Sequence, residues 1–95
     1  VTADEVPDPS RLTLVTRVNG REMQRSTTDL LIFDVPKLLA YLSTFVELEP
    51  GDVIATGTPA GVGAKRTPPV FLQAGDVVEV EIGGLGVLRN PVVDE

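Results

Sequence analysis

The sequence predicts an α+β fold that is mostly β: a twisted, mixed but mostly antiparallel sheet with one helix packed on it. Two long stretches alternate apolar and polar residues with the two-residue period of a strand. Dipeptides that favour tight turns separate such stretches, and only one segment carries apolar residues at helical spacing. The chain has 95 residues, which is enough for one small domain.

The N-terminal part predicts a β-hairpin. The opening VTADEVPDPS contains two prolines and three acids and predicts a loop. Leu12, Leu14, Thr16 and Val18 alternate with Thr13, Val15 and Arg17, the period of a strand with one buried face. Asn19-Gly20 follows, and this dipeptide favours a type I′ turn because both of its residues need positive φ. Residues 21–25 are then the returning strand.

A single helix is predicted next. Asp34 can cap its N-terminus, and Pro36 lies in the first turn, where its missing N–H costs little. One apolar stripe follows at helical spacing, formed by Val35, Leu38, Leu39, Leu42, Phe45 and Val46. Pro50-Gly51 ends the helix, which should cover the sheet. On its polar side Lys37 is expected to be solvated, while Tyr41 should pack at an interface.

The remainder predicts three more strands. GDVIAT (51–56) and GDVVEVEI (75–82) share a Gly-Asp-Val pattern that indicates a turn leading into a strand. Gly83-Gly84 predicts a second tight turn, after which LGVLRN (85–90) returns. Asn90-Pro91 ends that strand, because proline cannot donate to a ladder.

The composition removes several classes of chemistry. The sequence contains no cysteine and no histidine, which excludes thiol nucleophiles, histidine-based triads, disulfides and Cys/His zinc sites within these residues. Eight lysines and arginines stand against 14 acidic residues, a formal net charge of −6, and the basic residues are scattered. Neither nucleic acid nor a membrane surface is therefore an expected partner.

The stretch ATGTPAGVG (55–63) is the best candidate binding site. Glycines let the backbone approach a ligand, and successive N–H groups can form a concave site for an anion. Thr58 adds a hydroxyl donor, and Lys65 and Arg66 add positive charge nearby. A carboxylate or enolate oxygen is the natural ligand. A connecting loop rich in turn-forming residues explains the same pattern, and from pattern alone it is the more frequent outcome.

Two acidic clusters are weaker candidates. Glu79 and Glu81 point to the same face of a predicted strand, where they could share a divalent cation or simply form a solvated face. The solvated face is the simpler interpretation. Asp4, Glu5 and Asp8 could also bind a cation, but an acidic, proline-rich stretch usually forms an ordinary loop.

Four stretches together resemble the C-terminal half of the fumarylacetoacetate hydrolase family over essentially the whole chain. They are VTADEVPDP, VNGREMQRSTTDLLIF, LEPGDVIATGTPAGVG and PPVFLQAGDVVEVEIGGLGVLRNPVVDE, in this order. The Thr-Gly-Thr-Pro turn, followed by Pro-Pro-Val-x-Leu and Gly-Asp-x-Val-x-Val-x-Ile, is the most specific part. This form looks like the acylpyruvate hydrolases and 2-hydroxyhepta-2,4-diene-1,7-dioate isomerases of prokaryotes.

The resemblance implies a β-roll fold, a cytoplasmic homodimer, and Mg²⁺ or a similar hard cation (Mn²⁺ or Ca²⁺) as cofactor. The substrate would be a small 2-oxo or 2-hydroxy-enoic acid or diacid from the catabolism of aromatic compounds or amino acids. The reaction would be hydrolysis of a C–C bond, or isomerisation or decarboxylation. In each case the metal chelates the 2-oxo acid and stabilises the enolate as charge develops.

Few of the family's functional residues have counterparts here. The resemblance assigns Thr58 as the donor to the substrate carboxylate, with Gly57 permitting its approach. The family's metal ligands, active-site lysine and lid groups correspond to sequence upstream of Val1, so no catalytic residue and no metal ligand is assigned in this chain. Glu79-Val-Glu81 is not the family's metal pair. Thr27 stands where many relatives have asparagine, which leaves that segment without an assigned role.

These correspondences imply that residues 1–95 are the C-terminal portion of a single catalytic domain. Such a portion would be incomplete and inactive alone, its partner being the upstream half of the same protein, and it would expose an apolar sheet face. The first residue is valine rather than methionine, which favours this interpretation. The alternative is a non-catalytic module, a free-standing β-roll that binds an anion or mediates oligomerisation.

Overall fold

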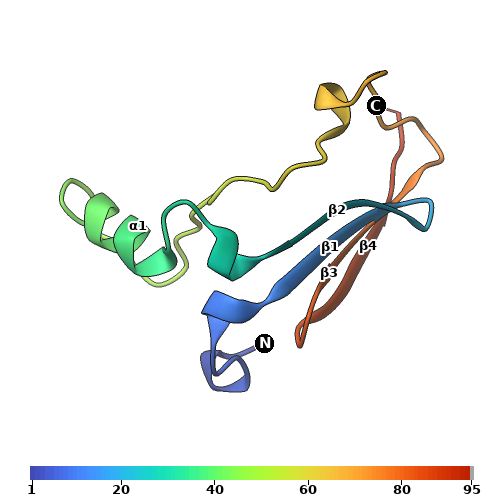
Figure 1. Cartoon of the computed structure of the whole chain (residues 1–95). Coiled ribbons are helices and arrows are strands. Elements are labelled where there is room, and N and C mark those ends of the chain that lie inside the picture. Colours follow the sequence, from blue (N-terminus) through green and yellow to red (C-terminus); the bar gives the residue numbers. More distant parts are fainter. Residues whose placement is uncertain (95) are drawn as a thin grey trace.

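The computed structural model describes residues 1–94. They form one four-stranded sheet with an α-helix to one side of it (Figure 1). The spatial order of the strands is β2-β1-β3-β4, and every neighbouring pair is antiparallel. The strands are β1 (Thr13–Val18), β2 (Arg21–Thr27), β3 (Val77–Ile82) and β4 (Gly86–Pro91). The predicted class, α+β with mostly antiparallel strands, is confirmed.

The predicted hairpin at Asn19-Gly20 is confirmed. Asn19 has a φ of 52° and Gly20 a φ of 77°, the positive values that a type I′ turn requires. The Asn19 side chain donates to Asp76 at 2.8 Å and accepts from the N–H of Val77 at 2.9 Å. The turn of the first hairpin is thereby joined to the start of β3. β2 continues to Thr27, beyond the predicted end at residue 25.

The turn between β3 and β4 is longer than predicted. It contains residues 83–85, whereas the sequence predicted a two-residue turn at Gly83-Gly84. The N–H of Leu85 bonds to the carbonyl of Ile82 at 2.9 Å. Gly86 has a φ of 110°, so the extra residue is followed by a glycine in the left-handed region, which other residues rarely adopt.

Helix α1 (Val35–Leu42) begins as predicted and ends early. Asp34 caps it by accepting from the N–H of Lys37 at 2.9 Å. Ser43 closes the helix, so the end of the predicted apolar stripe, at Val46, lies in turns. None of the helices formed by residues 1–94 is long and apolar enough to cross a bilayer.

Helix α1 does not cover the sheet, which corrects the prediction made from its apolar stripe. It lies beyond the end of β2 and is joined to the sheet by residues 28–34 and 43–76 (Figure 1). Its apolar side chains stay accessible, with Val35 42% and Leu39 41% exposed, and Phe45 in the turns after it is 61% exposed. The spacing of a stripe shows that a helix has a face to bury, but not which surface receives it.

Residues 51–56 do not form a strand, which corrects a second prediction. The segment returns from α1 toward the sheet without a neighbouring strand (Figure 1), and Val53 is 93% exposed. A strand requires a partner for its N–H and C=O groups. The Gly-Asp-Val pattern is local and does not specify such a partner.

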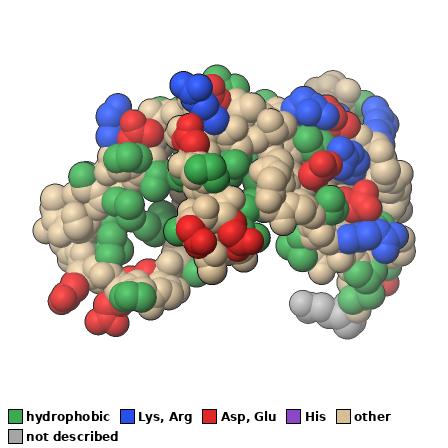
Figure 2. Space-filling model, turned by 90° about the horizontal axis from the view of Figure 1, so that it is seen from below, with side chains coloured by type: hydrophobic (Ala, Val, Ile, Leu, Met, Phe, Trp, Pro, Cys, Tyr) green, Lys and Arg blue, Asp and Glu red, His purple; other side chains and the backbone are tan. Residues whose placement is uncertain are grey.

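The two faces of the sheet differ in chemistry. The apolar face carries Leu14, Val80, Ile82 and Leu88, and the charged face carries Arg17, Glu79, Glu81 and Arg89. Figure 2 shows mixed charges over the sheet end and hydrophobic side chains around an opening at the α1 end. Val15, the one buried hydrophobic residue among those described, lies on the charged face opposite Glu81. On the apolar face Leu88 is 64% exposed, while Leu14, Val80 and Ile82 are half-buried. The apolar face is therefore only partly covered within residues 1–94.

Candidate functional site

The glycine-rich turn lines a cavity of about 550 Å³. Gly57 and Thr58, the two residues predicted to bind substrate, both lie in its wall. The opposite wall comes from the segment that follows β2 and from α1, and it is mainly apolar, with Leu30, Leu31, Ile32, Phe33 and Leu38. The structure thus places the predicted turn at a cavity rather than in a packed interior.

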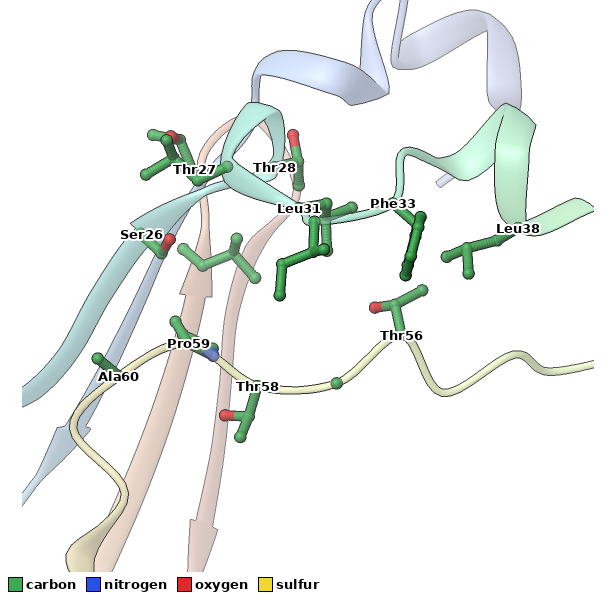
Figure 3. A pocket seen from close by; sticks show the side chains of 14 residues that line it. Ser26, Thr27, Thr28, Leu31, Phe33, Leu38, Thr56, Thr58, Pro59 and Ala60 are labelled. Atoms are coloured by element: carbon green, nitrogen blue, oxygen red, sulfur yellow. The ribbon is translucent and has the colours of Figure 1, made fainter. Parts of the chain in front are cut away.

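Thr56 and Thr58 point to opposite sides of the turn. Figure 3 shows Thr56 directed toward Phe33, and Thr58 directed away from the apolar side chains. Between them, Gly57 has a φ of 104°, and a Cβ placed on it would meet no atom within 4 Å. The space beside Gly57 is therefore open. A carboxylate could approach the backbone there and reach the exposed Thr58 hydroxyl.

Gln24 on β2 holds the Thr58 side chain. Its amide nitrogen donates to Thr58 Oγ1 at 3.0 Å and to the carbonyl of Pro59 at 3.0 Å. The two N–H groups of one side chain thus bond to two consecutive residues of the turn. Because Thr58 Oγ1 accepts one of these bonds, the hydroxyl proton remains available for donation.

Arg66 fastens the far end of the turn to the same strand. Its Nε donates to the carbonyl of Gly61 at 3.1 Å, and its Nη2 to the carbonyl of Met23 at 2.5 Å. The fit is close, because a Cβ on Gly61 would lie 2.3 Å from the Met23 oxygen. Arg66 was predicted to supply positive charge near the turn; in the structure its guanidinium bonds to backbone carbonyls. Lys65 lies exposed in the short 3-10 helix η4 (Gly63–Lys65).

A β-bulge in β2 explains how the consecutive residues Met23 and Gln24 both bond to the glycine-rich turn and its flank. The register passes from Thr16 opposite Gln24 to Arg17 opposite Glu22, so Met23 is the extra residue of β2. Sequence reasoning missed Gln24 and the structural role of Arg66. A bulge and its cross-chain partners leave no local pattern, so no signal in the sequence alone could have identified them.

The paired glutamates lie on the charged face and bond to arginines. Glu81 accepts from Arg17 at 2.6 Å, and Glu79 lies 3.3 Å from Nε of Arg89. This supports the solvated-face interpretation. Residues 1–94 contain no cluster of three or more acidic side chains that could hold a metal ion.

The N-terminal acids have local structural roles. Backbone and side-chain hydrogen bonds from Thr2 hold the pKa of Glu5 below its usual value, and the Ser10 hydroxyl does the same for the pKa of Asp8. The Thr2 side chain likewise lowers the pKa of Asp4. These bonds belong to the first turns of the chain and not to a shared cation site.

Three other residues noted in the sequence have plain surroundings. Lys37 is exposed and lies 4.0 Å from Asp34. Tyr41 packs edge-on against Phe45, with ring centroids 5.1 Å apart. Thr27 lines the cavity, and its hydroxyl donates to Asp29.

The chain matches the family model described as Fumarylacetoacetate (FAA) hydrolase C-terminal over residues 1–93. A mitochondrial oxaloacetate tautomerase of Xenopus laevis is 54% identical over 93 residues, which cover 98% of this chain and 29% of that protein. The relative therefore contains much more polypeptide than the chain described here.

Solved structures show the same similarity. A fumarylacetoacetate hydrolase from the psychrophile Exiguobacterium antarcticum is 49% identical, with a TM-score of 0.93 over 100% of this chain and 34% of that one. Maleylpyruvate hydrolase from Sphingobium sp. SYK-6, in complex with manganese(II) ion and pyruvate, is 40% identical. Its TM-score is 0.85, over 98% of this chain and 33% of that one.

The chain spans about a third of the length of the proteins it matches. Within that span, the sequence identity, the family match and the shared fold agree. The chain belongs to the fumarylacetoacetate hydrolase family.

Proposed function

We propose that this chain is the substrate-carboxylate side of an enzyme that acts on 2-oxo or 2-hydroxy-enoic acids and diacids. The observation that carries the proposal is the Thr58 hydroxyl, held by Gln24 beside the open space at Gly57. Two relatives give support, because oxaloacetate and maleylpyruvate, which appear in their names, are both 2-oxo acids. The pathway would belong to the catabolism of aromatic compounds or amino acids.

In this proposal Thr58 and Gly57 bind and orient the substrate carboxylate. The Thr58 hydroxyl donates to one oxygen of the substrate carboxylate, and the missing side chain of Gly57 lets that carboxylate reach the backbone. A hydrogen bond to a charged oxygen is stronger than one between neutral groups. The reaction itself is hydrolysis of a C–C bond, or isomerisation or decarboxylation, and its catalytic residues lie outside this chain.

The divalent cation expected for the family does not fit the residues described here. Glu79 and Glu81 are held by arginines, and residues 1–94 offer no cluster of three acidic side chains. Binding of Mg²⁺, Mn²⁺ or Ca²⁺ is therefore assigned to the upstream segment of the full-length protein. The manganese in the maleylpyruvate hydrolase structure supports use of such a metal.

The upstream half of the same protein is the proposed partner of the apolar sheet face. The face is only partly covered, with Leu88 64% exposed, while the relatives carry about twice as much further polypeptide as this chain contains. In this proposal residues 1–95 are the C-terminal portion of one catalytic domain and are inactive alone. A cytoplasmic homodimer is also proposed, on the family resemblance.

Replacing Thr58 with valine in the full-length protein tests the site. We expect kcat/KM with an acylpyruvate to fall. The corresponding loss of transition-state stabilisation should be about 1–3 kcal/mol, the range of a lost hydrogen bond to a charged group. Thr44→Val is the matched control, because Thr44 is exposed in the turns after α1 and does not line the cavity. Unchanged kinetics in Thr58→Val would contradict the proposal.

A non-catalytic module is the second candidate, and the partly exposed apolar face favours it. Such a module would bind an anion or mediate oligomerisation through that face. The full-length protein should be assayed with acylpyruvates and hydroxymuconate-type diacids, with and without Mg²⁺. Turnover of any of them supports the enzyme, whereas no turnover together with self-association through the apolar face supports the module.

A further inference from the structure

Gln24 joins β2 to the glycine-rich turn. It lies directly after the β-bulge at Met23, and its amide reaches across to the turn rather than along the sheet. Bulges often re-aim a side chain next to a functional site. The side chain is half-buried, and Gly61 passes close to it, since a Cβ there would lie 3.1 Å from Gln24 Cγ.

The direction of the hydrogen bond between Gln24 and Thr58 determines what the Thr58 hydroxyl can do. A hydroxyl can donate one hydrogen bond and accept two, so its direction depends on its neighbours. The Gln24 amide nitrogen can only donate, and it does so to Thr58 Oγ1. The Thr58 proton must then point away from the Gln24 nitrogen, which leaves it free to reach a ligand. The second bond, to the Pro59 carbonyl, fixes the amide in this orientation.

We infer that Gln24 is a positioning residue that makes Thr58 an obligate donor to a carboxylate. The inference rests on the proposed function, because it assigns how the same site recognises its ligand. Gln24 does not touch the ligand in this arrangement; it acts through Thr58. Its removal should therefore weaken carboxylate binding without removing any group that takes part in the reaction.

Two substitutions separate polarity from packing. Gln24→Leu removes both donated bonds and keeps approximate size. Gln24→Glu keeps the shape, but its carboxylate can only accept, so Thr58 would turn its proton toward residue 24 and away from a ligand. Gln73→Leu is the matched control, since Gln73 is exposed and lies outside the turn.

The experiment measures KM and kcat of the full-length protein, together with the Kd of pyruvate by calorimetry. We expect Gln24→Leu to raise KM and the pyruvate Kd about tenfold, with a larger rise in Gln24→Glu and little change in kcat. Gln73→Leu should match the wild type. In a Thr58→Val background, Gln24→Leu should have little further effect, because its target hydroxyl is gone.

The outcomes are distinguishable. If Thr58→Val raises KM but both Gln24 variants leave KM and Kd unchanged, the inference is wrong and the proposed function stands. Full additivity of Gln24→Leu and Thr58→Val would also overturn it, since a general loosening of the turn needs no hydroxyl. If Thr58→Val leaves KM and the pyruvate Kd unchanged, the proposed function is wrong, and the inference that rests on it is wrong as well. Thermal midpoints show whether Gln24→Leu folds. If it does not, the isosteric Gln24→Glu variant alone tests the inference.

Discussion

The guanidinium of Arg66 bonds to the backbone carbonyl of Met23 at 2.5 Å, across 43 positions of the chain. Met23 is the bulged residue of β2, so its carbonyl is available to a side chain. Arg66 also bonds to the carbonyl of Gly61. Together with the Gln24 contacts, this bond sets the position of the glycine-rich turn against the sheet.

Arg66→Met keeps most of the side-chain length and removes both bonds. We expect the free energy of unfolding of the full-length protein to fall by about 1–3 kcal/mol, because two carbonyls lose a charged donor. Urea denaturation measures the change. Lys65→Met removes the same charge from an exposed neighbour and should be nearly neutral. Equal losses in both variants would show that net charge, rather than the two bonds, is responsible.

Gly61 and Gly57 should respond differently to alanine. Both have a φ of 104°, but a Cβ on Gly61 meets the Met23 oxygen at 2.3 Å, whereas one on Gly57 meets nothing within 4 Å. We expect Gly61→Ala to destabilise the full-length protein by about 2–4 kcal/mol. Gly57→Ala should cost only about 1–2 kcal/mol of backbone strain. Thermal unfolding compares the two variants.

Gly57→Ala should instead affect binding. The new methyl group would occupy the open space beside the turn, so we expect KM to rise more in this variant than its loss of stability explains. Steady-state kinetics at a temperature where both proteins are folded measures the effect. A KM equal to the wild-type value would mean that the ligand does not approach the backbone at Gly57.

Asp76 should make stability depend on acid pH. The Asn19 side chain and the Gln73 N–H bond to its carboxylate and hold the pKa of Asp76 below its usual value. The ionised form therefore stabilises the folded state above the unfolded pKa, and this contribution is lost as pH falls through the lowered pKa. We expect Asp76→Asn to lose less stability than the wild type between about pH 5 and about pH 3.

Thermal midpoints across this pH range check the expectation for Asp76. Asp94→Asn, at the exposed C-terminal end, is the control for removal of one negative charge. Identical pH profiles for Asp76→Asn and the wild type would show that the bond from Asn19 does not favour the ionised carboxyl in solution.

Leu88 and Val87 test what covers the apolar face. They are neighbours on β4 but point to opposite faces, and they are 64% and 57% exposed within the described residues. If the upstream half packs on the apolar face, Leu88→Ala should lower the free energy of unfolding of the full-length protein by about 2 kcal/mol or more. Val87→Ala, on the charged face, should change it by about 0.5 kcal/mol or less. Two equally small effects would contradict that packing.

Local patterns in the sequence predicted local structure well. Asn19-Gly20 requires positive φ at two positions, and the Asp34 cap bonds within one turn, so both could be recognised from a few residues. The place of α1 and the unpaired segment 51–56 depend on surfaces far along the chain. An apolar stripe or a Gly-Asp-Val pattern does not encode which surface that is, and both predictions failed there.

The candidate site divides in the same way. Thr58 and Gly57 stand in a glycine-rich turn whose composition already indicated close backbone approach, and the family resemblance assigned them the carboxylate. Gln24 and Arg66 acquire their roles only when β2 and the turn meet, 34 and 43 positions apart in the bonded pairs. Polar residues of this kind are common, and only their three-dimensional neighbours distinguish them.

The pairing of β1 with β3 has a consequence for how such a chain diverges. Residues 28–76 form one long excursion, a connection that leaves the sheet after β2 and returns at β3. The bonds from Asn19 to Asp76 and Val77 hold the first hairpin against the start of β3, so the sheet is joined on both sides of this connection. Lengthening a closed loop adds little entropic penalty. Insertions and exchanges in the excursion can therefore alter ligand preference while the four-stranded platform keeps its register, which makes 28–76 the natural segment to transplant between relatives.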